Sequence, residues 1–282
     1  MFCADQRLRC VYRIGDLAFG SPFGCLTHGQ FNAWVSLIFE TVKAGAIEQA
    51  TRRFATAGSL TQRFLFNLIP SRIRAYRTLH LQQSREKCLA RLQNGNSKHQ
   101  DFIHYILKQQ EKHDLKQDEI IVNSALFIVA GSETTANALS GLFARLLRNP
   151  EKYELLVSEI RNAFSSEEEI TYSALSILPY LNACIEEGLR IHPPVPQGLL
   201  RTVPVGGDTI DGFWVPGGTS VAVGGWAASH NPENFVDCDE FVPERWLEGE
   251  RRWKGDKKKA MQPFSLGPRG CIGRHLSYME MR

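Results

Sequence analysis

Apolar residues recur at intervals of three and four along the first part of the chain, which is the spacing of one face of an α-helix. The pattern occupies most of residues 31 to 110 and includes Phe31, Trp34, Val35, Ile38, Phe39 and Val42, then Phe102, Ile103, Ile106 and Leu107. It is interrupted near Gly58, near Pro70 and across the polar stretch Gln93 to His99. We therefore expect a series of helices separated at these positions.

The longest helical pattern extends from Asp118 to Asn149. Acidic residues begin it, apolar residues fill its middle, and Pro150 follows its end. Asn149 is expected to cap a second helix, because its side chain can accept a hydrogen bond from a free N–H of the first turn and Pro150 suits the first helical position. A further helix is expected to begin near Pro179. It should end before the prolines of residues 192 to 196, which lack a backbone donor.

The pattern changes after residue 200. The segment TIDGFWV at residues 209 to 215, a turn at Pro216 to Gly218, and TSVAV at residues 219 to 223 alternate like a small β-hairpin. Residues 226 to 231 predict one helical turn, and residues 231 to 273 are rich in loop-forming residues. No internal repeat is visible, so the predicted fold class is a mainly α single domain with a small β component.

The composition is that of an ordinary folded protein, with 43% hydrophobic and 22% charged residues. Its formal net charge of +3 is too small for the broad basic face that nucleic-acid binding needs, so no nucleic-acid partner is expected. No stretch approaches the roughly 20 apolar residues of a membrane-spanning helix, and the N-terminus carries charges where a signal peptide has its apolar run. The chain as written is therefore expected neither to span a membrane nor to carry a secretion signal.

The seven cysteines are scattered, with no CxxC pair and no zinc-type spacing. A disulfide framework is not expected, and single cysteines fit a reducing compartment. Only Cys271 lies in a setting that would stabilise a thiolate.

That setting is the segment FSLGPRGCIG at residues 264 to 273. Gly267 and Gly273 let the backbone approach a flat ligand and turn amide N–H groups toward the Cys271 sulfur, while Arg269 can pair with a carboxylate on the ligand. The alternative is a buried cysteine in a tight turn. Average residue frequencies give the combined pattern on the order of once in ten thousand chains of this length, which favours the ligand site.

A second motif, AGSETT at residues 130 to 135, lies in the middle of the longest predicted helix. Small residues at Ala130 and Gly131 allow a close approach to a ligand, and Glu133 and Thr134 supply an acid and a hydroxyl. The alternative is a helix with small residues where another helix crosses it, and a threonine bonded to its own helix.

Two charged patterns complete the set. Glu187 and Arg190 are an i,i+3 pair on the helix that begins near Pro179. By itself this spacing is weak, because about one such pair is expected by chance. The basic stretch from Arg251 to Lys259 is either a solvated loop or a surface for an acidic partner.

The loop at residues 264 to 273 resembles the haem-binding signature of the cytochrome P-450 family. The resemblance implies that Cys271 is the axial ligand of the iron of haem b, iron protoporphyrin IX. It also implies that Arg269 pairs with a haem propionate, that Arg201 is a second propionate partner, and that Phe264 packs near the sulfur. A thiolate ligand directs electron density to the iron and favours O–O cleavage.

The other motifs resemble the same family. AGSETT is similar to its oxygen-activation motif, which implies that Glu133 and Thr134 are catalytic residues that deliver protons during dioxygen activation. In the family the ExxR pair and an arginine of a later segment form a buried triad on the haem-loop side. The segment FVPERW at residues 241 to 246 then assigns Glu187, Arg190 and Arg245 to this structural triad.

The resemblance implies a haem-thiolate monooxygenase that hydroxylates or epoxidises a small organic substrate in secondary-metabolite biosynthesis. Its implied partners are dioxygen, that substrate and an NADPH-dependent flavoprotein reductase that docks on the basic stretch. One alternative is a catalytically inactive truncated remnant or haem-binding fragment. Another is a haem-thiolate isomerase or dehydratase, which would use Cys271 but would not need Glu133 and Thr134.

The segment at residues 13 to 26, RIGDLAFGSPFGCL, resembles one that fungal secondary-metabolite members carry well inside the domain. Residues 1 to 282 are therefore expected to form a single partial domain of a cytochrome P-450 fold, without the upstream third and the final C-terminal strands. Full-length relatives are expected on the cytosolic face of the endoplasmic reticulum membrane; the location of this chain is left open.

Overall fold

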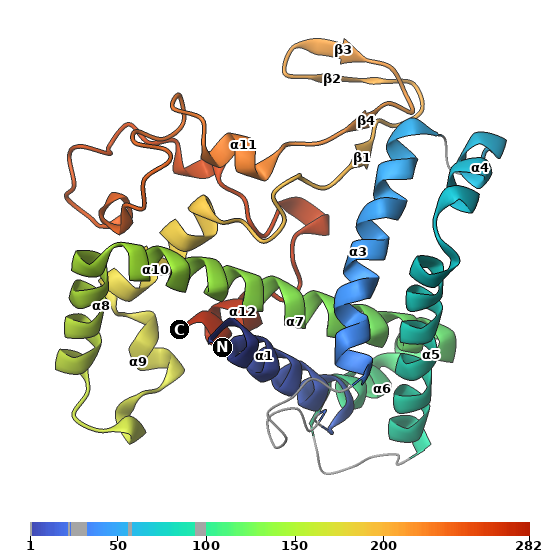
Figure 1. Ribbon diagram of the computed structural model, residues 1–282, viewed down its shortest axis with the longest axis horizontal. Coiled ribbons are helices and arrows are strands. Elements are labelled where there is room, and N and C mark those ends of the chain that lie inside the picture. Colours follow the sequence, from blue (N-terminus) through green and yellow to red (C-terminus); the bar gives the residue numbers. More distant parts are fainter. Residues whose placement is uncertain (1, 22, 24–32, 56–57, 94–99) are drawn as a thin grey trace. The chain divides into compact units, whose positions relative to one another are not determined.

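A computed structural model describes residues 2–21, 23, 33–55, 58–93 and 100–282. The chain divides into two compact units, an N-terminal unit of residues Met1–Ala136 and a C-terminal unit of residues Asn137–Arg282. Among the described residues, helices dominate both units and four short strands, all in the C-terminal unit, supply the β component (Figure 1). The prediction of a mainly helical fold with a small β component is confirmed. Within the described ranges, no helix has the length and apolar character needed to cross a membrane.

The N-terminal unit is entirely helical in its described part. Its helices are α1 (Phe2–Phe19), α3 (Ala33–Phe54), α4 (Leu60–Leu68), α5 (Ser71–Gln93), α6 (Phe102–His113) and the first part of α7 (Gln117–Arg148). The breaks predicted near Gly58 and Pro70 separate α3 from α4 and α4 from α5. The third break lies at residues 94–99, outside the described residues.

Local side-chain contacts fix the helix ends in this unit. The Ser59 hydroxyl caps α4 by accepting a hydrogen bond from the Gln62 N–H at 3.1 Å. The Asp101 carboxylate caps α6 by accepting from the His104 N–H at 2.7 Å, and it is buried against the Arg91 guanidinium, with Arg91 Nε 2.6 Å from Asp101 Oδ2. A buried apolar cluster holds these helices together: Ala18, Phe19, Ile38, Cys88, Ile103, Ile120, Ile121 and Ile128.

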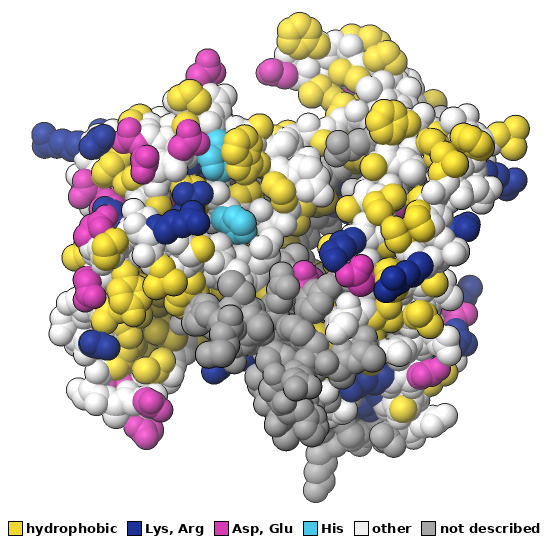
Figure 2. Space-filling model, in the orientation of Figure 1, with side chains coloured by type: hydrophobic (Ala, Val, Ile, Leu, Met, Phe, Trp, Pro, Cys, Tyr) yellow, Lys and Arg dark blue, Asp and Glu magenta, His cyan; other side chains and the backbone are white. Residues whose placement is uncertain are grey.

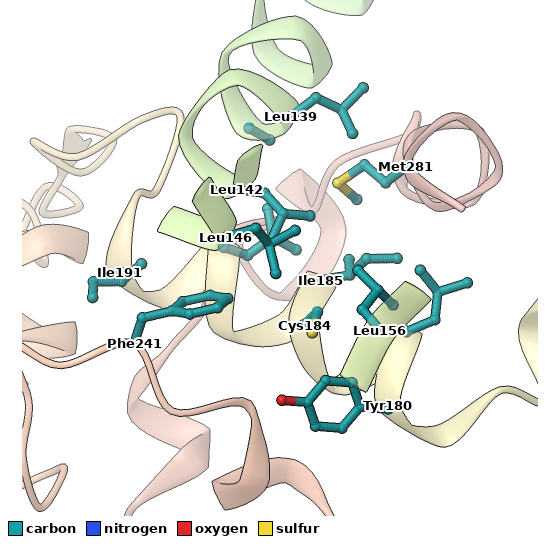
Figure 3. Close-up of a cluster of buried hydrophobic side chains, with 13 residues drawn as sticks. Leu139, Leu142, Leu146, Leu156, Tyr180, Cys184, Ile185, Ile191, Phe241 and Met281 are labelled. Carbon is teal, nitrogen blue, oxygen red and sulfur yellow. The ribbon is translucent and has the colours of Figure 1, made fainter. Parts of the chain in front are cut away.

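The C-terminal unit is built around α10, whose residues from Ala183 to Ile191 are buried except Glu186. Its other helices are the end of α7, α8 (Pro150–Ala163), α9 (Tyr172–Ser176), α11 (Gly225–Ser229) and α12 (Arg274–Met281), with 3₁₀ turns at Glu167–Glu169, Pro243–Trp246, Lys258–Ala260 and Gly267–Arg269. Figure 3 shows apolar side chains of α7, α10 and α12 pointing toward one another in its core. The predicted helix beginning near Pro179 and the predicted helical turn at residues 226 to 231 are confirmed.

The predicted β-hairpin is only partly correct. Strand β2 (Asp208–Ile210) pairs with β3 (Phe213–Val215), whereas β4 (Ser220–Val221) pairs with β1 (Arg201–Thr202). The tight turn of the hairpin is Asp211-Gly212, both residues having φ near +50° to +80°. A two-residue loop with both φ positive matches the twist of the flanking strands, which is why Asp-Gly prevails over the later Pro216 turn.

The predicted N-cap position of Asn149 is confirmed, with Pro150 in the first turn of α8. The expected hydrogen bond is wrong, because the Asn149 side chain makes no cap hydrogen bond. Its Nδ2 instead donates to the Arg145 carbonyl at 2.8 Å, one turn back in α7. Because α7 ends at Arg148, the amide satisfies a free carbonyl of the preceding helix rather than a free N–H of the next.

Candidate functional site

Backbone hydrogen bonds close the loop around Cys271. The Cys271 N–H donates to the carbonyl of Phe264 at 2.8 Å, and the Gly270 N–H donates to that of Gly267 at 2.9 Å. Gly267 has a φ of 71°, in the left-handed region where glycine is unstrained. This glycine therefore allows the chain to reverse direction ahead of the cysteine.

The Cys271 side chain is exposed, contrary to the alternative of a buried cysteine in a tight turn. Two apolar neighbours in the loop, Leu266 and Ile272, are also exposed, at 67% and 87%, and Arg269 is exposed. A Cβ atom added to Gly273 would lie 3.9 Å from the Cys271 sulfur, which is an ordinary contact. The loop thus presents a thiol, two apolar side chains and a cation to its surroundings.

Phe264 anchors this loop to the core of the C-terminal unit. Its half-buried ring lies 5.2 Å from the Tyr278 ring of α12, between centroids, and packs against the apolar cluster around α10. The Tyr278 hydroxyl donates to Glu186 Oε1 at 2.6 Å, and Arg282 Nε donates to Asn182 Oδ1 at 2.8 Å. Burial, with the adjacent carboxylate, raises the pKa of Tyr278 above its usual range, so the hydroxyl stays a donor. Helix α12, which follows the loop directly, is therefore fixed to α10.

Glu187, Arg190 and Arg245 meet in a fully buried ionic cluster. Arg190 Nε and Nη2 donate to the two carboxylate oxygens of Glu187, each at 2.8 Å, in bidentate geometry. Arg245 Nε donates to Glu187 Oε1 at 3.2 Å. The structure therefore brings together all three residues of the proposed triad, although they come from segments far apart in the sequence.

Two further side chains belong to this cluster and were not identified from the sequence. Asp256 accepts a hydrogen bond from Arg245 Nη1, and Trp246 Nε1 donates to Glu187 Oε2 at 2.9 Å. Two carboxylates thus balance two guanidinium groups inside the protein, which is the condition under which buried charge is tolerated. The available signal for Asp256 was that it is the one acidic residue in the basic stretch from Arg251 to Lys259.

The remaining guanidinium donors hold the irregular chain that follows α11. Arg190 Nη1 donates to the carbonyls of Ser229 and Cys238 at 2.8 and 2.6 Å. Arg245 Nη1 donates to the Val236 carbonyl at 2.9 Å. The Arg190 guanidinium carbon also lies 5.2 Å from the centre of the buried Phe235 ring. Because loop carbonyls need partners when buried, these contacts explain how a segment without regular structure packs onto α10.

The motif on α7 shows short-range contacts in the N-terminal unit. The Thr134 hydroxyl donates to the Ala130 carbonyl of its own helix at 2.7 Å. A Cβ atom added to Gly131 would lie 2.7 Å from Cδ1 of Ile14, so a small residue is required where α1 packs on α7. Both contacts are those of the structural alternative for this motif. The Thr134 oxygen nevertheless keeps acceptor capacity, and Glu133 is half-buried one residue before it.

Arg201 lies in β1, is exposed, and donates from Nη1 to the adjacent Leu200 carbonyl at 3.0 Å. It belongs to the C-terminal unit, as do Cys271 and Arg269, whereas Glu133 and Thr134 belong to the N-terminal unit. The residues expected to bind haem therefore lie in the C-terminal unit, and the residues expected to deliver protons lie in the N-terminal unit.

A cavity of about 520 Å³ lies in the N-terminal unit between α3, α4, α5 and α7. Its lining is mainly apolar, and α7 contributes Val122, Ala125, Leu126 and Val129, which share one helical face. This face ends directly before the motif at residues 130 to 135. The cavity could not be predicted from the sequence, because apolar residues on a helix predict burial and not a space beside it.

One side of this cavity carries polar groups. Arg77 Nη1 pairs with Glu48 Oε2 at 2.7 Å, and both residues line the cavity. His80 is buried between the Trp34 indole, which donates to Nδ1 at 3.1 Å, and the Ala125 carbonyl, 3.1 Å from Nε2. This arrangement assigns the proton of the neutral ring to Nε2, and burial lowers the pKa of His80.

The basic stretch, including its Trp253, lines a surface hollow of about 820 Å³ together with Arg245 and Leu247. Arg252 pairs with Asp237 at 2.8 Å, and Lys258 lies over the Trp246 ring, 5.4 Å from its centre. Some cations of the stretch thus have partners within the protein. The stretch is therefore neither a fully solvated loop nor a surface whose every cation is available to an acidic partner.

The described cysteines differ in their surroundings. Cys10, Cys88 and Cys184 are buried, Cys238 is half-buried, and Cys271 is exposed. Burial, together with the nearby Glu244, Glu159 and Glu187 carboxylates, raises the pKa of Cys184 to about 12. Of these thiols, only Cys271 combines exposure with a glycine-rich loop.

Comparison with known proteins gives a family match over nearly the whole chain. Residues 10–282 match the family model described as Cytochrome P-450. The chain is 48% identical over 271 residues to a cytochrome P-450 monooxygenase, aba2, of Botryotinia fuckeliana, an alignment that covers 95% of the chain and 51% of that relative.

Other fungal relatives give the same result. The chain is 43% identical over 274 residues to the cytochrome P-450 monooxygenase ABA2 of Pyricularia oryzae, covering 95% of the chain and 66% of the relative. It is 44% identical over 271 residues to the cytochrome P-450 monooxygenase astJ of Aspergillus oryzae, covering 95% and 53%. The chain spans about half the length of most of the curated relatives it matches.

Proposed function

The chain belongs to the cytochrome P-450 family, and we propose that it carries the haem-thiolate site of a fungal secondary-metabolite monooxygenase, with Cys271 as the axial ligand of the iron of haem b. The family implies haem. The single observation that carries the proposal for this chain is the exposed Cys271 thiol in a closed, glycine-containing loop.

The residues of the loop fit such a group. A thiolate suits iron, the exposed Leu266 and Ile272 suit the apolar face of a macrocycle, and a cation suits its propionates. When bound, a thiolate-ligated haem supplies the chemistry of O–O cleavage. Arg269 and Arg201 are proposed to pair with propionates, and both are exposed in the structure.

The other loop residues act by position. Phe264 packs the loop onto α12 and the α10 core, and this packing fixes the position of the Cys271 backbone relative to those two helices. Gly267 supplies the left-handed turn, and Gly273 leaves free space beside the sulfur. The ionic cluster of Glu187, Arg190 and Arg245 is proposed to hold the scaffold on which this loop rests, since α12 is hydrogen-bonded to α10.

Glu133 and Thr134 are proposed to move protons during dioxygen activation. The Thr134 hydroxyl donates to Ala130 O, so its proton has a defined direction, while its oxygen can accept a second hydrogen bond. The half-buried Glu133 carboxyl group one residue earlier is proposed to accept a proton from solvent and pass it to such a relay.

The remaining parts of the proposal concern the whole protein. The apolar cavity beside α7 is proposed to take the small organic substrate, because it lies on the face of α7 that precedes Glu133. The hollow of the basic stretch is proposed to receive an NADPH-dependent flavoprotein reductase. Both units are proposed to be parts of one domain, as the continuous family match over residues 10–282 supports.

Alkylation of the free thiol tests the haem site directly. Purified chain is treated with iodoacetamide with and without one equivalent of haemin, and the modified cysteines are quantified by mass spectrometry. Haem is expected to protect Cys271, because a metal-bound sulfur is a poor nucleophile, and to leave the labelling of Cys238 unchanged. Equal labelling of Cys271 in the haem-bound chain would refute the assignment.

Substitution of the threonine tests the reaction class. In the whole protein with its reductase, Thr134→Ala is expected to retain haem but to divert reducing equivalents to hydrogen peroxide, because proton delivery is impaired. Thr61→Ala, an exposed threonine of α4, is the matched control. An isomerase or dehydratase would consume no NADPH, and its turnover would not depend on Thr134.

A further inference from the structure

Charged side chains occupy one part of the wall of the cavity in the N-terminal unit. Helix α7 lines the cavity with apolar residues alone, whereas the charged lining residues, Glu48, Arg74 and Arg77, come from α3 and α5. Figure 2 shows basic and acidic side chains close together over α3 and α5, right of the centre, with hydrophobic side chains around them. A mainly apolar chamber with a few polar groups on one side is typical of a site for an apolar ligand with one polar end.

The two arginines lie on a face of α5 that is otherwise apolar. Four residues share this side of the helix and line the cavity: Ile73, Arg74, Arg77 and Leu81. An arginine on such a face packs its aliphatic stem along apolar neighbours and carries its charged group to the edge of the space. Both arginines are exposed, so their guanidinium groups lie beside the cavity and are reached by solvent.

The charges of this wall do not balance. Arg77 Nη1 lies 2.7 Å from Glu48 Oε2, so these two residues neutralise one another. In the described part of the chain, the Arg74 side chain has no hydrogen bond or ion pair to an acidic residue. The His80 ring is neutral near neutral pH, because burial lowers its pKa, and it adds no charge. One positive charge, that of Arg74, is therefore left over at the cavity wall.

A glycine on the opposite helix leaves room in this cavity. Gly45 lies within α3 and lines the cavity, and a Cβ atom added to it would meet no heavy atom within 4 Å. Its φ lies outside the left-handed region, so the backbone does not require glycine either. Glycine is an unfavourable residue in the interior of a helix. Its effect at this position is to leave open a space that a side chain would take up.

We propose that this cavity binds an apolar carboxylic acid, with the carboxylate on Arg74 and the hydrocarbon body against the α7 wall. The planar guanidinium group matches a carboxylate, which it binds through two parallel N–H···O hydrogen bonds. The single uncompensated charge matches the single charge of a carboxylate, whereas a phosphate group carries nearly two. A cationic ligand would be repelled by Arg74, and an uncharged ligand would leave that residue without a partner.

The proposal deepens the function proposed above, because it names the chemical class of the substrate. In that respect it rests on the proposed function, whereas the binding of the acid requires neither haem nor Cys271. A chain that binds the acid but leaves Cys271 unprotected by haem would contradict the proposed function alone. A chain that passes the haem test but does not prefer the acid would contradict only the proposal made here.

The test compares three ligands that share one hydrocarbon chain. Purified chain is dialysed to equilibrium against decanoic acid, 1-decanol or decylamine at about pH 7.5, where the acid is ionised and the amine is protonated. The bound ligand is quantified by mass spectrometry. Decanoate is expected to bind at least about tenfold more tightly than 1-decanol, because it gains hydrogen bonds between charged groups. Decylammonium should bind more weakly than 1-decanol. Equal affinities for the three ligands, or tightest binding of decylammonium, would overturn the proposal.

Substitutions of arginine locate the carboxylate. Arg74→Gln should lower the affinity for decanoate at least about tenfold and leave the affinity for 1-decanol within about twofold. Arg74→Lys should retain part of the preference, because it keeps the charge but not the planar group. Arg72→Gln is the matched control: Arg72 is an exposed arginine of α5 that does not line the cavity, and its loss should change decanoate binding by less than about twofold.

Two further variants test the rest of the wall. Glu48→Gln removes the opposing carboxylate and should raise the affinity for decanoate about threefold. Gly45→Leu fills the open space and should lower the affinities for decanoate and 1-decanol together, on the order of tenfold, with no loss of helix in the circular dichroism spectrum. If Gly45→Leu binds both ligands like the wild type, or if Arg72→Gln loses as much affinity as Arg74→Gln, the acid binds elsewhere and the proposal is wrong.

Discussion

The substitution Glu187→Gln removes one charge from the buried cluster with little change of shape. Glu187 accepts five hydrogen bonds, from Arg190 Nε and Nη2, Arg245 Nε, the Trp246 indole and the Val242 N–H. A glutamine replaces one acceptor oxygen by an NH₂ group. Whichever way the amide is oriented, it then faces at least two N–H donors, and two guanidinium groups remain buried with Asp256 alone.

The size of the effect follows from these contacts. Two buried donors without an acceptor cost about 1 to 3 kcal/mol each, and breaking a buried charge pair typically costs about 3 to 5 kcal/mol. We therefore expect the free energy of unfolding of the C-terminal unit to fall by about 3 to 5 kcal/mol, out of a total of roughly 5 to 15 kcal/mol. The midpoint of thermal unfolding should fall by about 6 to 20 °C.

Urea unfolding followed by circular dichroism at the helix band measures this loss. Glu154→Gln, an exposed carboxylate of α8, is the control and should change stability by less than about 0.5 kcal/mol. Asp256→Asn, at the other end of the cluster, provides a milder variant that should cost about 1 to 3 kcal/mol if Glu187→Gln does not fold. A loss below about 1 kcal/mol for Glu187→Gln would refute the reasoning, because the five contacts would then carry little energy.

Three further predictions concern other parts of the chain. Burial lowers the pKa of His80, so the folded chain favours the neutral ring. The stability that the neutral His80 contributes is fully present above the pKa of histidine in the unfolded chain, near 6.5, and is lost as the pH falls below that value, at up to about 1.4 kcal/mol per pH unit. Urea unfolding between about pH 7.5 and about pH 5 should show this slope in the wild type and a smaller slope in His80→Gln. The buried Cys184, with its pKa raised to about 12, should resist a thiol-specific disulfide reagent in the folded chain while the exposed Cys271 reacts first; rapid modification of Cys184 under native conditions would contradict its burial. Gly198→Ala should lower the free energy of unfolding by at least about 2 kcal/mol, because φ is +74° and the new Cβ would lie 1.9 Å from the Val223 carbonyl oxygen. The control Gly249→Ala, at φ +88° in open space, should lower it only by the conformational strain of about 1 kcal/mol. Equal losses in the two variants would show that the short distance to Val223 does not affect stability.

The course of the helices could be predicted from the sequence because apolar spacing acts locally. The pattern in residues 31 to 110, the long helix from Asp118 and the helix from Pro179 all depend on residues within one or two turns. The β region was harder. The Asp211-Gly212 turn is a strong local signal for a tight hairpin, but the pairing of β4 with β1 joins residues about 20 apart, which no local pattern specifies.

The candidate site divides in the same way. Glu187, Arg190 and Arg245 could be named only because the chain resembles a family in which such residues meet. Asp256 was missed, since a single acid among lysines and arginines has the composition of a solvated loop and its burial depends on Arg245. The N-cap position of Asn149 was predicted correctly but the partner of its side chain was not, because an amide between two helices can bond a free carbonyl of the first as well as a free N–H of the second, and here it bonds the Arg145 carbonyl.

The motif on α7 shows where sequence and structure give different kinds of information. Gly131 is required by Ile14, and Thr134 is bonded to Ala130, so both residues have structural reasons that would exist without any reaction. Their place in a motif of the cytochrome P-450 family supports an additional role. Only a measurement that follows protons or reducing equivalents separates the two, as the Thr134→Ala experiment does.

The most direct measurement of the central claim is the spectrum of the reduced, carbon monoxide-bound form after haem has been added to the chain. If Cys271 is the axial ligand, the wild type and Cys238→Ser should both show the red-shifted Soret band typical of thiolate-ligated haem, and Cys271→Ser should lack it while still binding haem. A red-shifted band that persists in Cys271→Ser, or its absence from wild-type chain that has bound one equivalent of haem, would contradict the account.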